Sequence, residues 1–313
     1  MLRSKTIVGL CVLGAASFAL YRAAADTAPP SRHSPLAVAV TVPDIEAIVK
    51  AVGGSDVATF SLLRGCLLRR DLLVEADVTS RLLVADAVVW TGFFGESSAI
   101  AATLDRLPPE QRTKLRQPAW IDVSRDATRI NVPVSTCEGY VEPQFMYGDP
   151  FFWLNPRNGR VIARNVADGL ARIRPERRQF YADNADRFAA TLDADIGRWT
   201  AQLAALKPFR VFTTQCGWQN LAQLGGPTFL TCRNSPGTLD APEALADQLS
   251  AQSVDLIIVD PNTPPKYAEV FRARTKVKVV TTPSSIGNLS GSRSYSTLFD
   301  NFIQVLRTAL TPP

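Results

Sequence analysis

Histidine and cysteine are the side chains that most often hold a metal ion or attack a substrate, and this sequence is short of histidine. Among its 313 residues the only histidine is His33, which lies in a proline-rich stretch near the N-terminus. A Ser-His-Asp triad and a Cys-His nucleophile pair both need an imidazole beside the nucleophile. The chain also has no phosphate-binding glycine loop and no carboxylate pair of diagnostic spacing. These observations predict a protein that is not an enzyme.

The cysteines are the other candidates for site chemistry. Cys11 lies in an apolar N-terminal run, and four cysteines follow it, namely Cys66, Cys137, Cys216 and Cys232. An even number in an exported chain favours two disulfides. Four cysteines allow three pairings, among which the sequence alone does not choose, and the pairs we expect are Cys66–Cys137 and Cys216–Cys232. Cys216 and Cys232 each follow a predicted strand, and the ends of neighbouring parallel strands lie close together. The alternative is a thiolate site for a soft ion such as Cu(I), made by Cys66, Cys137 or Cys216.

Residues 1–25 have the pattern of a secretory signal peptide. The basic start MLRSK precedes the apolar run TIVGLCVLGAASFALY, and small residues suited to cleavage lie near Ala25. The alternative is an uncleaved membrane anchor. Residues 26–35 are polar and proline-rich, and we interpret them as a tether. Removing the signal lowers the 34 basic residues to 31 against 29 acidic ones, so the formal net charge falls from +5 to about +2.

The pattern of the remaining chain predicts an α/β fold with two lobes. In residues 36–174, apolar runs typical of buried strands alternate with amphipathic stretches. The expected strands are 36–42, 57–63, 86–90 and 119–124, and the expected helices are 44–54, 78–85, 96–107 and 155–173. Asp44 is the expected N-cap of the first helix, and Gly53 its stop. This alternation is typical of a mostly parallel sheet flanked by helices.

One long helix is expected over residues 175–206, beginning with Pro175 in the first turn. Residues 207–313 then repeat the first pattern as a second lobe. Its expected strands are 209–214, 228–232, 254–260 and 277–282, and its expected helices are 217–224, 241–251, 265–274 and 295–311. Ligands of parallel α/β sheets bind at the C-terminal ends of the strands. Several notable residues are expected there, namely Cys66, Trp90, Gln215, Cys216, Cys232, Asp260 and Ser284.

Four motifs connect this layout to a known family. They are AVTVPDIEAIVKAVGG, ADAVVWTGFFGE, DPFFWLNPRNGRVIARNVADGLARIRPERRQFYADNADRF and TTQCGWQNLAQLGG. The chain resembles, over roughly residues 36–311, the zinc- and manganese-specific solute-binding proteins of bacterial ABC importers. The third motif is the most specific, because members of the family have an Asp-Pro-His-x-Trp-Leu-Asp-Pro pattern there. The resemblance implies a monomeric periplasmic protein that delivers its ligand to an ABC permease or another inner-membrane protein.

The same resemblance implies a metal site of three histidines and one carboxylate, and this sequence departs from it at each position. The first histidine falls near Arg70, the second at Phe151, and the third at Gln215. The acid falls at Ser284 or its neighbour Ser285. Phenylalanine cannot coordinate a metal, and neutral amide and hydroxyl oxygens are weak ligands for Zn²⁺. We therefore expect neither Zn²⁺ nor Mn²⁺ in the family's manner, and no cofactor.

A degenerate, non-histidine site between the lobes is the resulting hypothesis. We expect its residues to be Arg69, Arg70, Trp90, Phe151, Gln215, Cys216 and Ser284. Arginines there would repel a cation and favour an anionic ligand. The function expected is an exported solute-binding component with a changed ligand. The alternatives are a ligand-free docking or accessory protein of a membrane complex, and Cu(I)-type thiolate binding.

Two further expectations separate these alternatives. A ligand-binding protein should bring polar groups together between its lobes, whereas a docking protein should fill that space with side chains such as Phe151 and Phe152. No lysine- and arginine-rich run is interleaved with aromatic residues, so a nucleic-acid partner is not expected.

Overall fold

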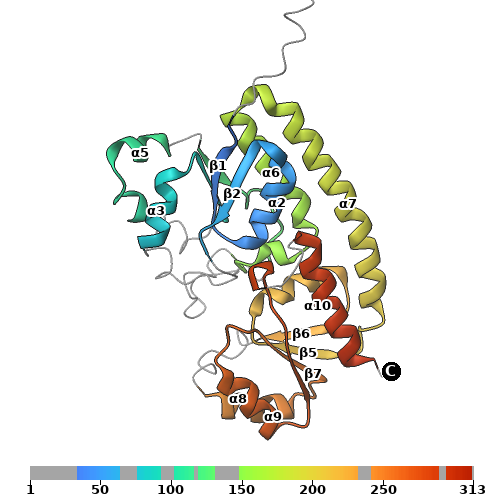
Figure 1. The fold of residues 1–313 in the computed structure, drawn as a ribbon. Helices are drawn as coiled ribbons and strands as arrows, with labels where there is room; N and C mark the ends of the chain where they lie inside the picture. The colour runs from blue at the N-terminus through green and yellow to red at the C-terminus, as the bar shows by residue number, and fades with distance from the viewer. Residues whose placement is uncertain are drawn as a thin grey trace, which may run out of the picture. The chain divides into compact units, whose positions relative to one another are not determined.

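A computed structural model shows how the chain folds. It describes residues 34–63, 76–92, 102–115, 119–130, 148–231, 241–288 and 294–311. From Leu36 onward these residues form one compact unit that contains two parallel sheets flanked by helices, with a long helix between them (Figure 1). The predicted fold class is therefore confirmed. In the described part of the chain, no helix combines the length and apolar character needed to span a bilayer.

The sheet of the N-terminal lobe has the strand order β2-β1-β3-β4, with every neighbouring pair parallel. The strands are β1 (Leu36–Val40), β2 (Val57–Ser61), β3 (Ala87–Trp90) and β4 (Trp120–Asp122). The central strands β1 and β3 are almost completely buried, which explains why their sequences are unbroken apolar runs. All four strands lie within the predicted ranges.

The helices of this lobe follow the prediction less closely. Those with both bounds described are α2 (Pro43–Gly53), α3 (Ala76–Val84), α5 (Pro109–Lys114) and α6 (Asn158–Ile173), with short 3₁₀ helices η1 (Gly54–Asp56) and η4 (Phe152–Leu154). Of the expected helix 96–107, residues 102–104 are described and are helical. Asp44 as N-cap is wrong, because Val42 takes that place and Pro43 begins the helix. Gly53 is the last residue of α2, and Gly54 ends it with φ 54°.

The predicted long helix is shorter than expected at its start. A 3₁₀ turn, η5 (Pro175–Arg177), precedes α7 (Arg178–Ala204), whose 27 residues span about 40 Å at 1.5 Å per residue. Figure 1 shows α7 running from the N-terminal lobe to the C-terminal one. It packs against α2 and α6 in the first lobe and against α10 (Tyr295–Leu310) in the second.

Polar contacts fix α7 to both lobes. Near its start, the hydroxyl of Tyr181 and the guanidinium of Arg174 both donate to the Asp56 carboxylate, the latter at 2.7 Å. Near its end, the indole Nε1 of Trp199 donates to Oδ1 of Asp300 on α10 at 2.8 Å. The helix is therefore held by hydrogen bonds as well as by its apolar face.

The sheet of the C-terminal lobe repeats the arrangement, with the order β6-β5-β7-β8 and parallel pairing throughout. The strands are β5 (Arg210–Thr213), β6 (Thr228–Thr231), β7 (Leu256–Val259) and β8 (Lys278–Thr281), again within the predicted ranges. Two adjacent helices, α8 (Pro242–Ala251) and α9 (Pro265–Arg274), cover one face. The predicted helix at 217–224 is a 3₁₀ helix, η6 (Cys216–Leu224).

The opposite face of this sheet joins the core of the first lobe. Val211, Leu256 and Ile258 from β5 and β7 belong to one apolar cluster with Ile45 of α2 and Trp153 of η4. Contacts between the lobes run from α2 and η4 to η6, η9 (Ile286–Asn288) and α10, and we call these contacts the lobe junction. The junction is thus a continuation of the hydrophobic core.

Candidate functional site

The predicted site residues that the structure describes lie where parallel strands end. Trp90 is the last residue of β3, Gln215 follows β5 by two residues, and Ser284 follows β8 by three. Trp90 packs edge-on against Trp120 of β4, with ring centroids 5.5 Å apart. Trp90 is therefore explained by packing within its own sheet.

Phe151 is buried at the lobe junction. Its side chain is 7% exposed, and its ring packs edge-on against Trp153 with centroids 5.6 Å apart. The carboxylate of Asp149, itself fully buried, accepts a hydrogen bond from the Phe151 N–H at 2.9 Å. A Cβ added at Gly217, in the first turn of η6, would lie 2.6 Å from the Cβ of Phe151. Phe151 therefore occupies the space between η4 and η6.

A buried asparagine holds the aromatic motif in place. The Asn158 side chain donates to the carbonyl oxygens of Phe152 and Thr128, both at 2.8 Å, and accepts from the Thr128 N–H at 2.9 Å. Phe152 and Trp153 have no exposed surface. These two aromatic residues are part of the core, and the backbone hydrogen bonds of Asn158 fix the segment that carries Phe151.

Ser284 is bound to a carboxylate at the end of the neighbouring strand β7. Its N–H donates to Oδ2 of Asp260 at 3.0 Å, and its hydroxyl donates to the same oxygen. The other oxygen, Oδ1, accepts from the N–H and the side-chain amide of Asn262, each at 2.8 Å. Thr214, which follows β5, accepts from the Asp260 N–H at 2.9 Å. Asp260 is therefore the centre of a satisfied polar group next to Gln215.

A second buried acid lies at the lobe junction, and the sequence assigned it only a capping role. Asp44 in α2 has no exposed surface, and its Oδ1 accepts a hydrogen bond from the Ile286 N–H of η9 at 2.8 Å. Burial raises the pKa of Asp44 from 3.8 to about 6, although the Ile286 hydrogen bond opposes the rise. Asp44 and Ile286 are 242 positions apart in the chain, so no local sequence pattern predicts their contact.

The remaining predicted site residues stay predictions. Arg69 and Arg70 lie outside the described residues, as do Cys66, Cys137 and Cys232, and for Cys216 only the backbone is described. Neither disulfide pair nor the thiolate site is therefore tested. Among the residues that the structure does describe, no group of three His, Cys, Asp or Glu side chains is placed to hold a metal ion.

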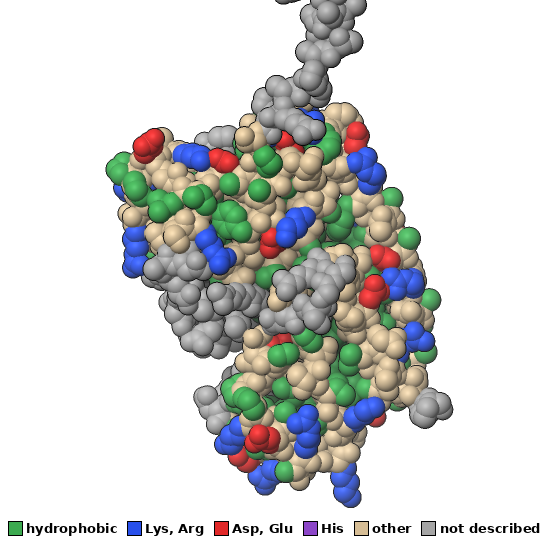
Figure 2. All heavy atoms as spheres, viewed as in Figure 1, with side chains coloured by type: hydrophobic (Ala, Val, Ile, Leu, Met, Phe, Trp, Pro, Cys, Tyr) green, Lys and Arg blue, Asp and Glu red, His purple; other side chains and the backbone are tan. Residues whose placement is uncertain are grey.

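On the face of the molecule that Figure 2 shows, charged side chains of one sign do not gather into a patch. Lysine and arginine side chains alternate there with aspartate and glutamate over both lobes. This mixture agrees with the small net charge expected for the chain without its N-terminal 25 residues. It offers no basic stripe of the kind that tracks a nucleic-acid backbone.

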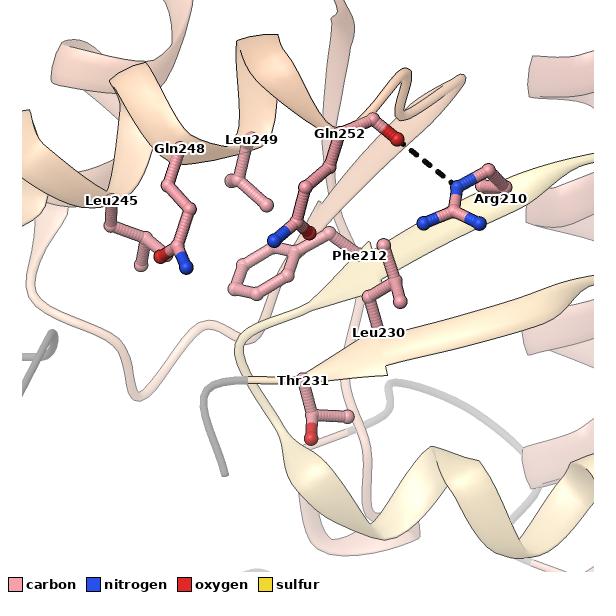
Figure 3. Close-up of a pocket in the computed structure, with 8 residues that line it drawn as sticks. All are labelled: Arg210, Phe212, Leu230, Thr231, Leu245, Gln248, Leu249 and Gln252. Carbon is pink, nitrogen blue, oxygen red and sulfur yellow. Dashed lines mark hydrogen bonds between the residues drawn. The ribbon is translucent and has the colours of Figure 1, made fainter. Parts of the chain in front are cut away.

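A separate cavity of about 270 Å³ lies between α8 and the strands β5 and β6 (Figure 3). Phe212 and Leu249 give it an apolar floor, and Gln248, Gln252 and Arg210 lie at its rim. The Arg210 Nε donates to the Gln252 carbonyl oxygen at 3.1 Å. None of the predicted site residues lines this cavity, so it is distinct from the position of Phe151.

Comparison with protein families gives one match over most of the chain. The model of the family described as "Zinc-uptake complex component A periplasmic" (ZnuA) matches residues 38–309. Curated relatives include the high-affinity zinc uptake system protein ZnuA of Brucella suis biovar 1, 25% identical over 169 residues, or 52% of this chain and 50% of the relative. The same-named protein of Haemophilus ducreyi is 23% identical over 67% of this chain and 72% of the relative. The chain spans about half the length of the first of these relatives.

Solved structures agree with the fold. A crystal structure of ZnuA is 16% identical and covers 88% of this chain and all of its own, with a TM-score of 0.69. The periplasmic zinc-binding protein TroA from Treponema pallidum is 16% identical, covers 89% of this chain and 100% of its own, and has a TM-score of 0.68. At these identities the likeness establishes the two-lobed fold.

Proposed function

Because the chain belongs to the family of periplasmic zinc-uptake component A proteins, we propose that it is an exported solute-binding component of an ABC-type importer whose ligand has changed. Its curated relatives are named high-affinity zinc uptake system proteins, so zinc is the cargo that their names imply. In this chain the cargo would be held by groups other than histidine and passed to a permease in the inner membrane. The protein would carry out no reaction of its own.

The observation that carries this proposal is the burial of Phe151. A zinc ligand must present a lone pair from an imidazole, a thiolate or a carboxylate. The residue at the family's second histidine position is Phe151, whose aromatic side chain is only 7% exposed. It packs so closely against Gly217 that a Cβ added to this glycine would lie 2.6 Å from the Phe151 Cβ. A metal ion bound in the family's way would have to displace this ring.

The two other described positions are also poor zinc ligands. Gln215 offers a neutral amide, and the Ser284 hydroxyl already donates to Asp260. Asp260 is the carboxylate that Ser284 contacts, and its oxygens accept four hydrogen bonds, two from Ser284 and two from Asn262. Releasing a buried, satisfied carboxylate to a cation would cost these bonds. The polar group therefore favours a ligand recognised by hydrogen bonds.

The ligand class that fits best is a small organic anion. Arg69 and Arg70 are expected near this end of the first sheet, and arginine recognises carboxylates and phosphates through paired N–H groups. The Gln215 side chain adds an amide that both donates and accepts. An anionic chelate of a metal is included in this class, because it would be bound through its carboxylates.

Equilibrium titration tests the proposal. Zn²⁺ and Mn²⁺ are titrated separately into the mature protein, without an affinity His-tag, by calorimetry at neutral pH, with a histidine-containing ZnuA protein as the positive control. We expect no saturable heat at micromolar metal from this chain. Saturable binding of one metal ion per chain would contradict the proposal.

A ligand-free docking protein is the second candidate, and one observation favours it. The apolar core continues through the lobe junction, where Phe151, Leu154 and Trp218 are all buried. Native mass spectrometry of the exported protein separates the candidates. A bound small molecule supports the solute-binding protein. A protein that carries none and co-purifies with a membrane complex supports docking.

A further inference from the structure

The lobe junction contains a buried carboxylate that forms no ion pair with any lysine or arginine in the described part of the chain. Asp44 lies in the first turn of α2, in the N-terminal lobe, and has no exposed surface. Its Oδ1 accepts the Ile286 N–H of the C-terminal lobe at 2.8 Å. Its Oδ2 is buried and accepts no hydrogen bond from any residue that the structure describes. One oxygen therefore joins the lobes, and the other is left without a donor.

The groups around this carboxylate come from three other segments. The indole N–H of Trp153 in η4 and the hydroxyl of Ser285 face the Asp44 carboxylate and act to lower its pKa, but neither donates a hydrogen bond to Oδ2. Tyr295 of α10 faces the same group and donates its hydroxyl to the Trp153 carbonyl oxygen at 2.5 Å. Among the described residues that act on Asp44 none is a lysine or arginine.

Asp44 is the group in this cluster that titrates in mildly acidic solution. Burial, followed by the charge of Asp44, raises the pKa of Tyr295 well above its ordinary value, so the phenol stays protonated. Burial also raises the pKa of Asp44 itself to about 6. The ionised form makes the stronger hydrogen bond to Ile286, but the cost of burying its charge is larger, as the direction of the shift requires.

We propose that Asp44 is a proton-operated latch between the lobes, which holds the junction more tightly when the carboxyl is protonated than when it is ionised. A proton on Oδ2 removes the buried charge, while Oδ1 still accepts the Ile286 N–H. The inference does not depend on which ligand the protein carries, because it rests on contacts between α2, η4, η9 and α10.

The sign of the effect follows from proton linkage. In an opened junction Asp44 meets water and has its ordinary pKa of 3.8, whereas in the closed junction its pKa is about 6. The closed form therefore binds the proton more tightly, and its advantage is lost as the pH rises from about 4 to about 6. A difference of about two pKa units corresponds to a change of roughly 100-fold in the opening equilibrium.

Amide hydrogen exchange of Ile286, measured by NMR between pH 3 and pH 7, tests the latch directly. After correction for the intrinsic exchange rate, protection should fall by about 100-fold with rising pH, mainly between about pH 4 and about pH 6. Asp44→Asn keeps an acceptor for the Ile286 N–H but carries no charge, so its protection should stay high and independent of pH. Asp186→Asn changes an exposed acid on α7 and should behave as the wild type.

The indole Nε1 proton of Trp153 gives a readout that needs no variant. Because this N–H faces the Asp44 carboxylate, its chemical shift should titrate in the folded wild type with a midpoint near pH 6. A wild-type Ile286 protection that is flat with pH, or an equal fall in Asp44→Asn, would overturn the latch. An indole shift that does not change between pH 5 and pH 7 would overturn it as well.

Discussion

The substitution Gly217→Ala tests directly how closely η6 packs against Phe151. The added Cβ would lie 2.6 Å from the Cβ of Phe151 and 2.7 Å from Cδ1 of Leu154. A side chain can swing its outer atoms away, but the Phe151 Cβ is fixed to the backbone, so the two segments must move apart. Overpacking of this kind costs about 1–3 kcal/mol. Alanine also restricts the backbone of the unfolded chain more than glycine does, and this stabilises the folded protein by about 0.4–1 kcal/mol.

The net expectation is a loss of roughly 1–2 kcal/mol in the free energy of unfolding. For a chain of this size that lowers the melting temperature by about 2–3 °C, which circular dichroism can follow. Gly197→Ala is the matched control, because a Cβ at that exposed position in α7 meets nothing within 4 Å. Alanine there should stabilise the protein by up to about 1 kcal/mol. If Gly217→Ala melts at or above the temperature of Gly197→Ala, the packing described for Phe151 is wrong.

Three other perturbations have defined outcomes. Relative to Asp44→Asn, the wild type should lose roughly 3 kcal/mol of unfolding free energy between pH 3 and pH 7, because the folded-state pKa of Asp44 is raised from 3.8 to about 6. Denaturant titrations at each pH measure this loss. Asp56→Ala removes the buried acceptor of the Tyr181 hydroxyl and of the Arg174 guanidinium and should cost about 3 kcal/mol. Asp193→Ala removes a half-exposed ion pair and should cost under about 1 kcal/mol. Ser284→Ala removes the hydroxyl donor to Asp260 and should cost about 1–2 kcal/mol in thermal unfolding.

Local patterns were sufficient to predict the strands and the long helix. Apolar runs such as LAVAV and LIIV lie in fully enclosed parallel strands, where burial on both faces requires them. Helix α5 (Pro109–Lys114) escaped prediction because it buries no residue and therefore has no apolar periodicity. The capping role expected for Asp44 failed because Pro43 is better suited to begin a helix, which places the carboxylate in the first turn.

At the described candidate positions, the residue types could be read from the sequence but their contacts could not, and the site itself stays a prediction. The motif around Phe151 identified the position, and its phenylalanine already excluded a metal–imidazole bond there. The packing of Phe151 at Gly217 and the bond from Ile286 to Asp44 join segments far apart in the chain. Such contacts depend on how the two lobes pack against each other. Neither the spacing of apolar residues nor a helix-capping residue predicts this packing. Asp260 had one usable signal, its place directly after the apolar strand β7.

Elemental analysis and native mass spectrometry of one sample test the central claim most directly. The mature protein is purified from an exporting host without chelator and without a His-tag, so that any bound ligand stays with it. We expect less than stoichiometric zinc and manganese, and a mass that exceeds that of the chain by a small organic anion. One zinc or manganese ion per chain, lost on treatment with a chelator, would show that the protein still binds its metal as a zinc-uptake protein does.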